Sequence, residues 1–217
     1  LNYLDVWTRR GLPGIDLEMP HIPGSDGAGV VEAVGEGVTR FEAGDRVALS
    51  AGLSCGECEF CRHGEESMCV SFRIIGEHTR GVHSELAALP ADNLVPVPDG
   101  VDWEIAAAAP LVFQTAWRML VTRADLRPGQ SVLVLGASGG VGHAAVQIAD
   151  HLGAEVYATG STDQKCDHAL ELGADHAINY ETEDFPAEIR DRTGRRGVDV
   201  VVDHIGAATC QDSLKSL

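Results

Sequence analysis

The 217-residue chain has few aromatic and few basic side chains. Phe, Trp and Tyr together make up 5% of its residues, and 16 Lys and Arg stand against 33 Asp and Glu, a formal net charge of −17 at pH 7. Such a negative field repels nucleic acid and anionic lipid, so we expect neither as a partner. The hydrophobic fraction of 44% can support a core, so the acidity does not indicate disorder. We interpret the acidic excess as adaptation of the source organism to high salt.

Long apolar runs are also missing from the sequence. No stretch approaches the length of about 20 apolar residues that spans a bilayer, so we expect no membrane partner and a cytoplasmic location. The cytoplasm keeps thiols reduced, and a pair of disulfide bridges is therefore not expected among the six cysteines. Cys166 and Cys210 are interpreted as ordinary thiols.

Four of the cysteines lie in one short segment with the spacing C-x2-C-x2-C-x7-C, and they are Cys55, Cys58, Cys61 and Cys69. The lobe at residues 54–70 has a single aromatic side chain, Phe60, and too little apolar surface to order itself. Four thiolates around one tetrahedral cation order such a lobe, and zinc is the common metal there. An iron–sulfur cluster is the alternative, but the ferredoxin run ends C-x3-C-P, unlike this one. We therefore predict a structural zinc ion.

The chain before about residue 115 has short apolar segments cut by Gly and Pro, a pattern typical of an all-β barrel. The predicted strands are residues 29–35, 45–49, 84–89 and 93–97. The cysteine lobe is an insertion in this barrel. Residues 103–120 then favour helix, and Pro110 predicts a break between two helices.

From about residue 131 the pattern becomes an alternation of strand and helix. Strands are predicted at residues 131–135, 155–159, 177–180 and 198–202, and helices at 141–152, 164–172 and 183–193. The first strand is apolar throughout, as expected when both faces of a sheet are covered. The alternation indicates an α/β, doubly wound parallel sheet.

A glycine-rich loop, GASGGVG at residues 136–142, joins the first of these strands to its helix. Spaced glycines allow a tight turn, close approach of a pyrophosphate to the backbone, and close helix–strand packing. The helix N-terminus adds free N–H groups and the positive end of its dipole. A turn without a ligand is the alternative, but the context between a buried strand and an amphipathic helix favours binding. The predicted dinucleotide contacts are Ser138, Gly139, Gly140, Val141 and Gly142.

The end of the second strand bears on which dinucleotide binds. NAD sites usually carry an Asp or Glu there, for the ribose 2′-OH. Here Ser161 stands at that end and Lys165 follows one turn later, so no carboxylate repels a 2′-phosphate and Lys165 can pair with it. Asp163 lies past the strand and is interpreted as a helix N-cap. We predict NADP(H), with a solvated, unliganded Lys165 as the alternative.

Together these features resemble the medium-chain dehydrogenase/reductase superfamily, whose members include the zinc-type alcohol dehydrogenases. Residues 23–29 partly match its P-G-H-E-x-x-G stretch, residues 44–47 match G-D-x-V, and the glycine loop matches A/G-x-x-G-x-x-G. Thr115 begins a match to the helix start beside the nicotinamide. Residues 160–165, with Tyr180, resemble the NADPH-binding pattern of the quinone oxidoreductase branch. The resemblance implies a GroES-like barrel followed by a Rossmann domain, and it adds Thr115 and Tyr180 to the expected cofactor contacts.

The sequence departs from the zinc alcohol dehydrogenases at the ligands of their catalytic zinc. Asn2 stands where they have Cys, Ser25 where they have His, and the third position falls near Leu111 or Val112. Neither Asn nor Ser is an ordinary zinc ligand. We therefore expect a structural but no catalytic zinc.

This departure bears on the reaction. Without a Lewis acid, a simple ketone or aldehyde loses the polarisation of its carbonyl, whereas a conjugated acceptor needs less of that help. We hypothesise an NADPH-dependent oxidoreductase acting on a quinone, an enone or a related carbonyl. Asn2, Tyr3 and Ser25 are candidate hydrogen-bond donors, and no catalytic residue is assigned. An alcohol or aldehyde dehydrogenase with an altered metal site and a non-catalytic NADPH sensor are the alternatives.

The resemblance also predicts the extent and organisation of the chain. We expect a GroES-like substrate domain at residues 1–115, carrying the zinc lobe, and an incomplete NADP-binding Rossmann domain at residues 116–217. By the same resemblance the sequence is a C-terminally truncated fragment that opens midway through the early barrel strands. The expected partners are a small-molecule substrate and, for the full-length protein, further copies in a homo-oligomer.

Overall fold

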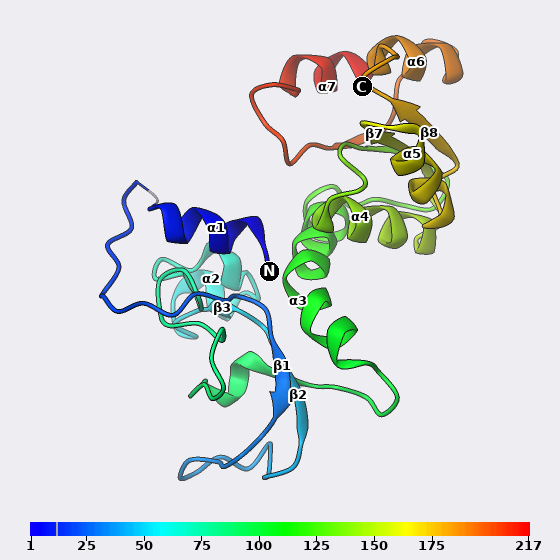
Figure 1. Ribbon diagram of the computed structural model, residues 1–217. Helices are drawn as coiled ribbons and strands as arrows, with labels where there is room; N and C mark the ends of the chain where they lie inside the picture. The colour runs from blue at the N-terminus through cyan, green and yellow to red at the C-terminus, as the bar shows by residue number, and fades with distance from the viewer. Residues whose placement is uncertain (12) are drawn as a thin grey trace. The chain divides into compact units, whose positions relative to one another are not determined.

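The computed structural model describes residues 1–11 and 13–217 (Figure 1). The chain divides into two compact units, Leu1–Leu111 and Val112–Leu217. Each unit has hydrophobic clusters of its own.

The N-terminal unit combines one helix with two small antiparallel sheets. Helix α1 covers Tyr3–Arg10. The first sheet has the order β1-β2-β5, and its strands are β1 (Ala28–Val30), β2 (Arg46–Leu49) and β5 (Leu94–Pro96). The second sheet pairs β3 (Gly52–Leu53) with β4 (Arg73–Ile74). The segment between β3 and β4 carries the cysteines, with the short helix α2 (Glu59–Arg62) and a 3-10 turn at Glu66–Met68.

The predicted strand at residues 84–89 is wrong, because this segment is an irregular loop. Most of its side chains face solvent: Leu86 is 75% exposed and residues 84–88 are all exposed, whereas Leu89 is partly buried against the cluster of Leu49, Ala51 and Ile75. Instead of a ladder, the Ser84 hydroxyl donates to the Leu86 carbonyl at 2.8 Å. A strand needs a neighbour for its backbone groups, and the described residues provide none here. The strand predicted at residues 29–35 is likewise shorter than expected and ends at Val30.

The first residues form a helix instead of the expected early barrel strand. The backbone N–H of Asn2 donates to Asp5 Oδ2 at 2.7 Å, so a carboxylate in the first turn caps α1 and suits its positive dipole end. Arg9 and Arg10 occupy the last turn, where cations are favourable. Gly11 then ends the helix with a φ of 87°, in the region that favours glycine.

The predicted break at Pro110 is also wrong, because α3 (Trp103–Trp117) continues through it. A proline in a helix removes one N–H and disturbs the preceding turn. Here the next N–H, that of Leu111, donates to Asp26 Oδ1 at 3.1 Å, so a side chain stabilises the disturbed turn. A π-helical stretch, Arg118–Arg123, follows without interruption.

This joined helix corrects the expectation about apolar runs. By length and composition alone, Trp103–Arg123 is long and apolar enough to cross a membrane, with a mean hydropathy of 1.2 in its most apolar window. Core helices of proteins that do not span membranes have the same composition, so the property by itself assigns no membrane role.

The C-terminal unit is a four-stranded parallel sheet with the order β8-β7-β6-β9. Its elements in chain order are β6 (Ser131–Val134), α4 (Gly140–His151), β7 (Glu155–Gly160), α5 (Asp163–Glu171), β8 (His176–Asn179), α6 (Phe185–Arg192), β9 (Val200–Val202) and α7 (Cys210–Ser216). In register, Val132 lies opposite Val156 of β7 and Val200 of β9. The predicted α/β alternation is confirmed.

The core of this unit lies on both faces of β6. Val132, Leu133 and Val134 have no exposed surface. Val132 and Val134 belong to the cluster that includes the buried alanines of α4, and Leu133 belongs to the cluster that includes Phe185 and Ile189 of α6. Burying such side chains contributes roughly 1.5–3 kcal/mol each, which makes β6 a rigid base for the loop that follows it.

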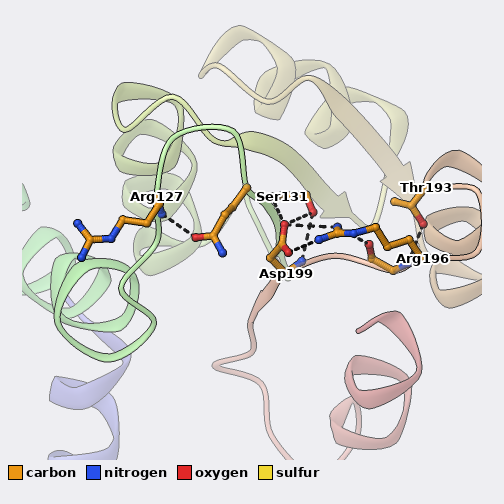
Figure 2. Close-up of polar contacts among 7 residues, drawn as sticks. Arg127, Ser131, Thr193, Arg196 and Asp199 are labelled. Carbon is orange, nitrogen blue, oxygen red and sulfur yellow. Dashed lines mark hydrogen bonds and ion pairs between the residues drawn. The ribbon is translucent and has the colours of Figure 1, made fainter.

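A polar cluster holds the opposite end of the sheet, where β6 begins (Figure 2). Asp199 accepts hydrogen bonds from the backbone and hydroxyl of Ser131 at 2.8 and 3.0 Å, and it pairs with Arg196. The Arg196 guanidinium, followed by the Ser131 N–H, lowers the pKa of Asp199 to about 2. This cluster ties the start of β6 to the segment before β9, whereas the glycine loop follows the other end of β6.

Candidate functional site

The four cysteines of the lobe converge. Their sulfur atoms all lie within 4.8 Å of one another, with Cys58 and Cys61 sulfurs 3.5 Å apart and Cys55 and Cys61 sulfurs 3.9 Å apart. A tetrahedral zinc with Zn–S bonds of about 2.3 Å places its sulfurs about 3.8 Å from one another. The cluster therefore has the donor set and the spacing that zinc requires.

Backbone N–H groups aim at these sulfurs. Cys69 Sγ accepts from the N–H groups of Cys55 and Ser71, at 3.3 and 3.4 Å, and this lowers the pKa of Cys69. The N–H groups of Cys61 and Val70 lower the pKa of Cys58 to about 6. Loss of water, followed by the neighbouring sulfur of Cys58, raises the pKa of Cys61 to about 11. N–H donors that favour thiolates are typical of metal-binding cysteine loops.

A second polar cluster joins the start of α1 to the loop at residues 23–29, and we call it the Asn2–Asp26 cluster. Asp26 accepts from the Asn2 side-chain amide at 2.8 Å and from the Leu111 N–H at 3.1 Å. Asp5 accepts from the Asn2 backbone at 2.7 Å and from the N–H groups of Gly24 and Ser25 at 3.2 Å each. Asn2 is thus held by two carboxylates, one at its backbone and one at its side chain.

Burial raises the pKa of Asp26 above its ordinary value of 3.8 and outweighs the lowering by Asn2 and Leu111. Asp26 was not among the residues singled out as possible donors. Its position beside Ser25 was the available signal, but the contact with Asn2 is visible only once α1 has folded against the loop.

Ser25 cannot serve as the substrate donor that the sequence suggested. It has no exposed surface, and its hydroxyl finds no hydrogen-bond partner among the described residues. The backbone explains this burial, since a Cβ on Gly76 would stand 2.7 Å from Ser25 Oγ. Asn2 is partly exposed and Tyr3 is 71% exposed, so these two keep access to a ligand.

The glycine loop leaves the end of β6 and begins α4. Gly136 has a φ of 60°, and its carbonyl accepts from the Gly139 N–H at 2.9 Å, which closes the turn. A Cβ on Gly142 would stand 2.3 Å from the Gly136 oxygen, so only glycine fits there. Gly142 is therefore buried and serves packing, whereas Ser138, Gly139 and Gly140 are exposed at the start of α4 and Val141 is partly exposed.

The end of β7 brings together the residues predicted to select the cofactor. Lys165 Nζ donates to Ser161 Oγ at 2.8 Å, and the Tyr180 N–H donates to the Gly160 carbonyl at 3.1 Å. Lys165 is exposed and Tyr180 is 43% exposed. A cationic side chain and a phenol thus lie at the carboxyl end of β7 and β8, where a dinucleotide would place its adenosine ribose.

Asp163 is not the N-cap of α5, as the sequence suggested. Thr162 is the N-cap, and its hydroxyl accepts from the Lys165 N–H at 3.3 Å. Asp163 is the first helical residue and accepts from the Asn179 side chain at 2.7 Å. Its carboxylate is therefore tied to the end of β8.

Val112 and His204 border the glycine loop from other elements of the same unit. Thr115 is exposed on α3, one turn after Val112, whose side chain would lie 2.9 Å from a Cβ on Gly140. The His204 ring lies 3.6 Å from the place of a Cβ on Gly136, and burial lowers its pKa. The predicted cofactor residues of this unit are thus grouped around one end of its sheet.

Comparison with protein families gives two matches along the chain. Residues 1–99 match the alcohol dehydrogenase GroES-like domain, and residues 140–217 match the zinc-binding dehydrogenase domain.

Individual proteins resemble the whole chain. A 2-haloacrylate reductase of Burkholderia sp is 37% identical over 100% of the chain and 59% of its own length. A quinone oxidoreductase of Pseudomonas aeruginosa is 36% identical over 99% of the chain and 58% of its own length. The crystal structure of an NAD-dependent alcohol dehydrogenase has 48% identity and a TM-score of 0.96, covering 100% of this chain and 63% of that one. The chain therefore spans about three fifths of the length of the proteins it matches.

Proposed function

Because this chain belongs to the medium-chain dehydrogenase/reductase superfamily of zinc-type alcohol dehydrogenase-like proteins, we propose that the protein is an NADPH-dependent oxidoreductase. Its acceptor is a quinone, an enone or a related conjugated carbonyl compound. It holds a structural zinc at the cysteine lobe and no catalytic zinc.

The observation that carries this proposal is the Asn2–Asp26 cluster. Asn2 stands where the zinc alcohol dehydrogenases have a cysteine ligand, and its amide is bound to Asp26 at 2.8 Å. Ser25 stands at the histidine position and is fully buried. Among residues 1–11 and 13–217, only the four lobe cysteines bring together three or more side chains able to hold a metal ion. The residues of the Asn2–Asp26 cluster favour a hydrogen-bonding site over a Lewis-acid site.

The chemistry follows from those residue types. NADPH, when bound, supplies the hydride. A conjugated acceptor that takes hydride at carbon develops negative charge on its oxygen. The Asn2 amide and the exposed Tyr3 hydroxyl are donors that can stabilise this charge, and solvent can deliver the proton that completes reduction. The first relative named above is a reductase of 2-haloacrylate, in which a carbon–carbon double bond is conjugated to a carboxylate.

At the lobe, Cys55, Cys58, Cys61 and Cys69 would hold the zinc, which there orders the loop between β3 and β4. Four protein ligands close the coordination sphere, and a closed site has no open position for a substrate. The lobe therefore contributes stability to the N-terminal unit.

Lys165, Ser161 and Tyr180 support NADPH as the cofactor. The Lys165 ammonium lies 2.8 Å from the Ser161 hydroxyl, and this pair can bind a 2′-phosphate by a charge-assisted contact. Asp163 is engaged with Asn179 and does not face a ribose as free carboxylate. The 48%-identical structure is that of an NAD-dependent enzyme, so the cofactor needs a direct test. The ratio of kcat/KM for NADPH and NADH provides it, and a clear preference for NADH would refute this part of the proposal.

An acceptor panel tests the reaction itself. Full-length protein is assayed with NADPH against benzoquinones, naphthoquinones, enones and 2-haloacrylate, and in the reverse direction with NADP⁺ and secondary alcohols. The proposal predicts turnover of conjugated acceptors that continues in the presence of a chelator for as long as the fold persists. Turnover of secondary alcohols that a chelator abolishes, with quinones and enones inert, would contradict it.

An alcohol or aldehyde dehydrogenase is the second candidate, and the high identity to an alcohol dehydrogenase structure favours it. It requires a second metal or a substitute for it at the Asn2–Asp26 cluster. Measured metal content separates the two functions, since the first predicts one zinc per chain and the second allows two. The cytoplasmic location and the homo-oligomer stay predictions.

A further inference from the structure

Asp26 joins three segments that are far apart in the sequence. Its Oδ2 accepts from the Asn2 side chain at 2.8 Å, and its Oδ1 accepts from the Leu111 N–H at 3.1 Å, in the turn that Pro110 disturbs. Both carboxylate oxygens therefore have a donor, one from the N-cap of α1 and one from the middle of α3. The side chain is only partly exposed, so neither bond is easily exchanged for water.

A carboxylate in this place determines how the Asn2 amide is oriented. An asparagine side chain carries two N–H donors and a carbonyl, and its two ends are nearly equal in shape. An ionised carboxylate only accepts, so it binds the nitrogen end and excludes the carbonyl end. One N–H of Asn2 is thereby used, and the second N–H and the carbonyl have a fixed direction.

The backbone of Asn2 does not depend on Asp26. Asp5 accepts from the Asn2 N–H at 2.7 Å and from the N–H groups of Gly24 and Ser25, so it alone ties the start of α1 to the loop. Asp26 therefore adds something that helix capping does not require, namely a bond to the partly exposed side chain.

We propose that Asp26 is a positioning residue that fixes the Asn2 amide as the hydrogen-bond donor to the substrate oxygen. This inference rests on the proposed function for the identity of the substrate, but the contact itself does not. Asn2 touches the acceptor, and Asp26 acts only through Asn2. In the absence of the Asp26 carboxylate the amide rotates, and its donor is no longer aligned when charge develops.

The charges around Asp26 set how this contact responds to pH. The Asp5 carboxylate faces it from α1 and opposes its ionisation, whereas the Asn2 amide and the Leu111 N–H of α3 favour ionisation. Burial is the largest effect and raises the pKa of Asp26 from 3.8. Protonation converts one acceptor oxygen into a donor, which loosens the Asn2 amide. Acidification is thus expected to lower kcat/KM at a pH above that of an ordinary aspartate.

The test is a double-mutant cycle on the full-length enzyme with Asp26→Asn, Asn2→Ala and both together. Ser25→Ala is the matched control, since it removes a neighbouring buried hydroxyl that has no partner among the described residues. Asp26→Asn is expected to lower kcat by about tenfold to a hundredfold with an unchanged Kd for NADPH, because misaligned donors lose transition-state stabilisation. In an Asn2→Ala background the same change is expected to have an effect below about twofold. The acid limb of the pH profile is expected to disappear in both single variants and to persist in Ser25→Ala.

Independent losses that multiply in the double variant would overturn the proposal, as would an Asp26→Asn enzyme with wild-type kcat and an unchanged acid limb.

If the wild type reduces only simple carbonyls, the proposed function fails, and the same cycle on that substrate still decides the role of Asp26. If no acceptor is turned over, the side-chain amide signals of Asn2 decide it in ¹⁵N-asparagine-labelled protein. They are expected to shift with a pKa above 3.8 and to stop shifting in Asp26→Asn. Signals that titrate identically in the two proteins would exclude the contact.

Discussion

The cysteine lobe and the Asn2–Asp26 cluster are two polar groups of the same unit with opposite composition. The lobe gathers four sulfur atoms within 4.8 Å and surrounds them with N–H donors. In the Asn2–Asp26 cluster, the carboxylates of Asp5 and Asp26 already accept from N–H donors of the chain, at 2.7 to 3.2 Å. Four converging thiolates call for a cation, whereas carboxylates that are already paired with N–H donors do not. This difference supports the proposal that the zinc of the lobe is structural and takes no part in the proposed reaction.

Removing one ligand of the lobe tests the first half of the comparison and has the largest expected effect. Cys58→Ser is expected to lose most of the bound zinc and to lower the melting temperature by several degrees or more, since zinc binding to such sites is worth roughly 10–16 kcal/mol. Metal analysis together with thermal unfolding measures both. Cys210→Ser is the control, because this exposed cysteine lies outside the cluster. Full zinc content in Cys58→Ser would show that the lobe does not hold the zinc through its four cysteines.

Rebuilding the ligands of the zinc alcohol dehydrogenases tests the second half. The double variant Asn2→Cys/Ser25→His is expected to bind no additional zinc, because Leu111 offers only its backbone at the third position. It is also expected to lose about 1–3 kcal/mol of stability, since the Ser25 site is fully buried and has no room for an imidazole. Zinc content and a urea unfolding curve provide the measurement. A second equivalent of zinc in this variant would mean that the Asn2–Asp26 cluster binds a metal ion once Cys and His stand at positions 2 and 25.

The C-terminal unit extends the comparison, because its Lys165–Ser161 pair is the proposed contact of the 2′-phosphate. Lys165→Ala is expected to raise the KM for NADPH about tenfold, or ~1.4 kcal/mol, and to leave the KM for NADH unchanged. Lys215→Ala is a matched control, since Lys215 is the other lysine of the unit and pairs with Asp212. Equal effects of Lys165→Ala on both cofactors would show that Lys165 is not the 2′-phosphate contact.

Asp199 offers a hydrogen-bonded carboxylate whose role is structural, so its substitution is expected to change stability alone. Arg196 and Ser131 lower the pKa of Asp199 from 3.8 to about 2 in the folded protein. A lowered folded pKa stabilises the protein above the unfolded pKa, and this contribution is lost as the pH falls from about 4 towards 2. Asp199→Asn is expected to cost roughly 1–2 kcal/mol at pH 7 and to flatten the acid dependence of unfolding.

The control for that prediction is Asp125→Asn, which breaks an exposed pair with Arg127 whose side chains are 69% and 68% exposed. Such pairs contribute little, so stability is expected to stay within about 0.5 kcal/mol. An equal loss in both variants would mean that the Ser131 contacts of Asp199 do not matter.

The sequence predicted the C-terminal unit better than the N-terminal one, for a physical reason. Strand β6 is buried on both faces, so it is apolar throughout and stands out from its neighbours. The loop at residues 84–89 has apolar residues too, but it has no neighbouring strand among the described residues, and local composition does not show this. The helix break predicted at Pro110 was wrong for the same reason. The carboxylate that stabilises this turn, Asp26, lies 85 residues away from Leu111 in the sequence.

The candidate sites also divide into those that follow from a local sequence pattern and those that depend on tertiary packing. The cysteine spacing is a local pattern, and the structure brings the four sulfurs together as predicted. Ser138, Gly139 and Gly140 follow directly from the loop motif and are exposed at the start of α4. The burial of Ser25 and the contact between Asn2 and Asp26 depend on tertiary packing, and they were found only in the structure.

Zinc content per chain, measured on the full-length protein together with the acceptor panel, tests the central claim most directly. We expect one zinc per chain, held by the four cysteines, and reduction of quinones or enones by the same preparation. Two zinc ions per chain, with turnover confined to alcohols and aldehydes and lost when one metal is removed, would contradict it.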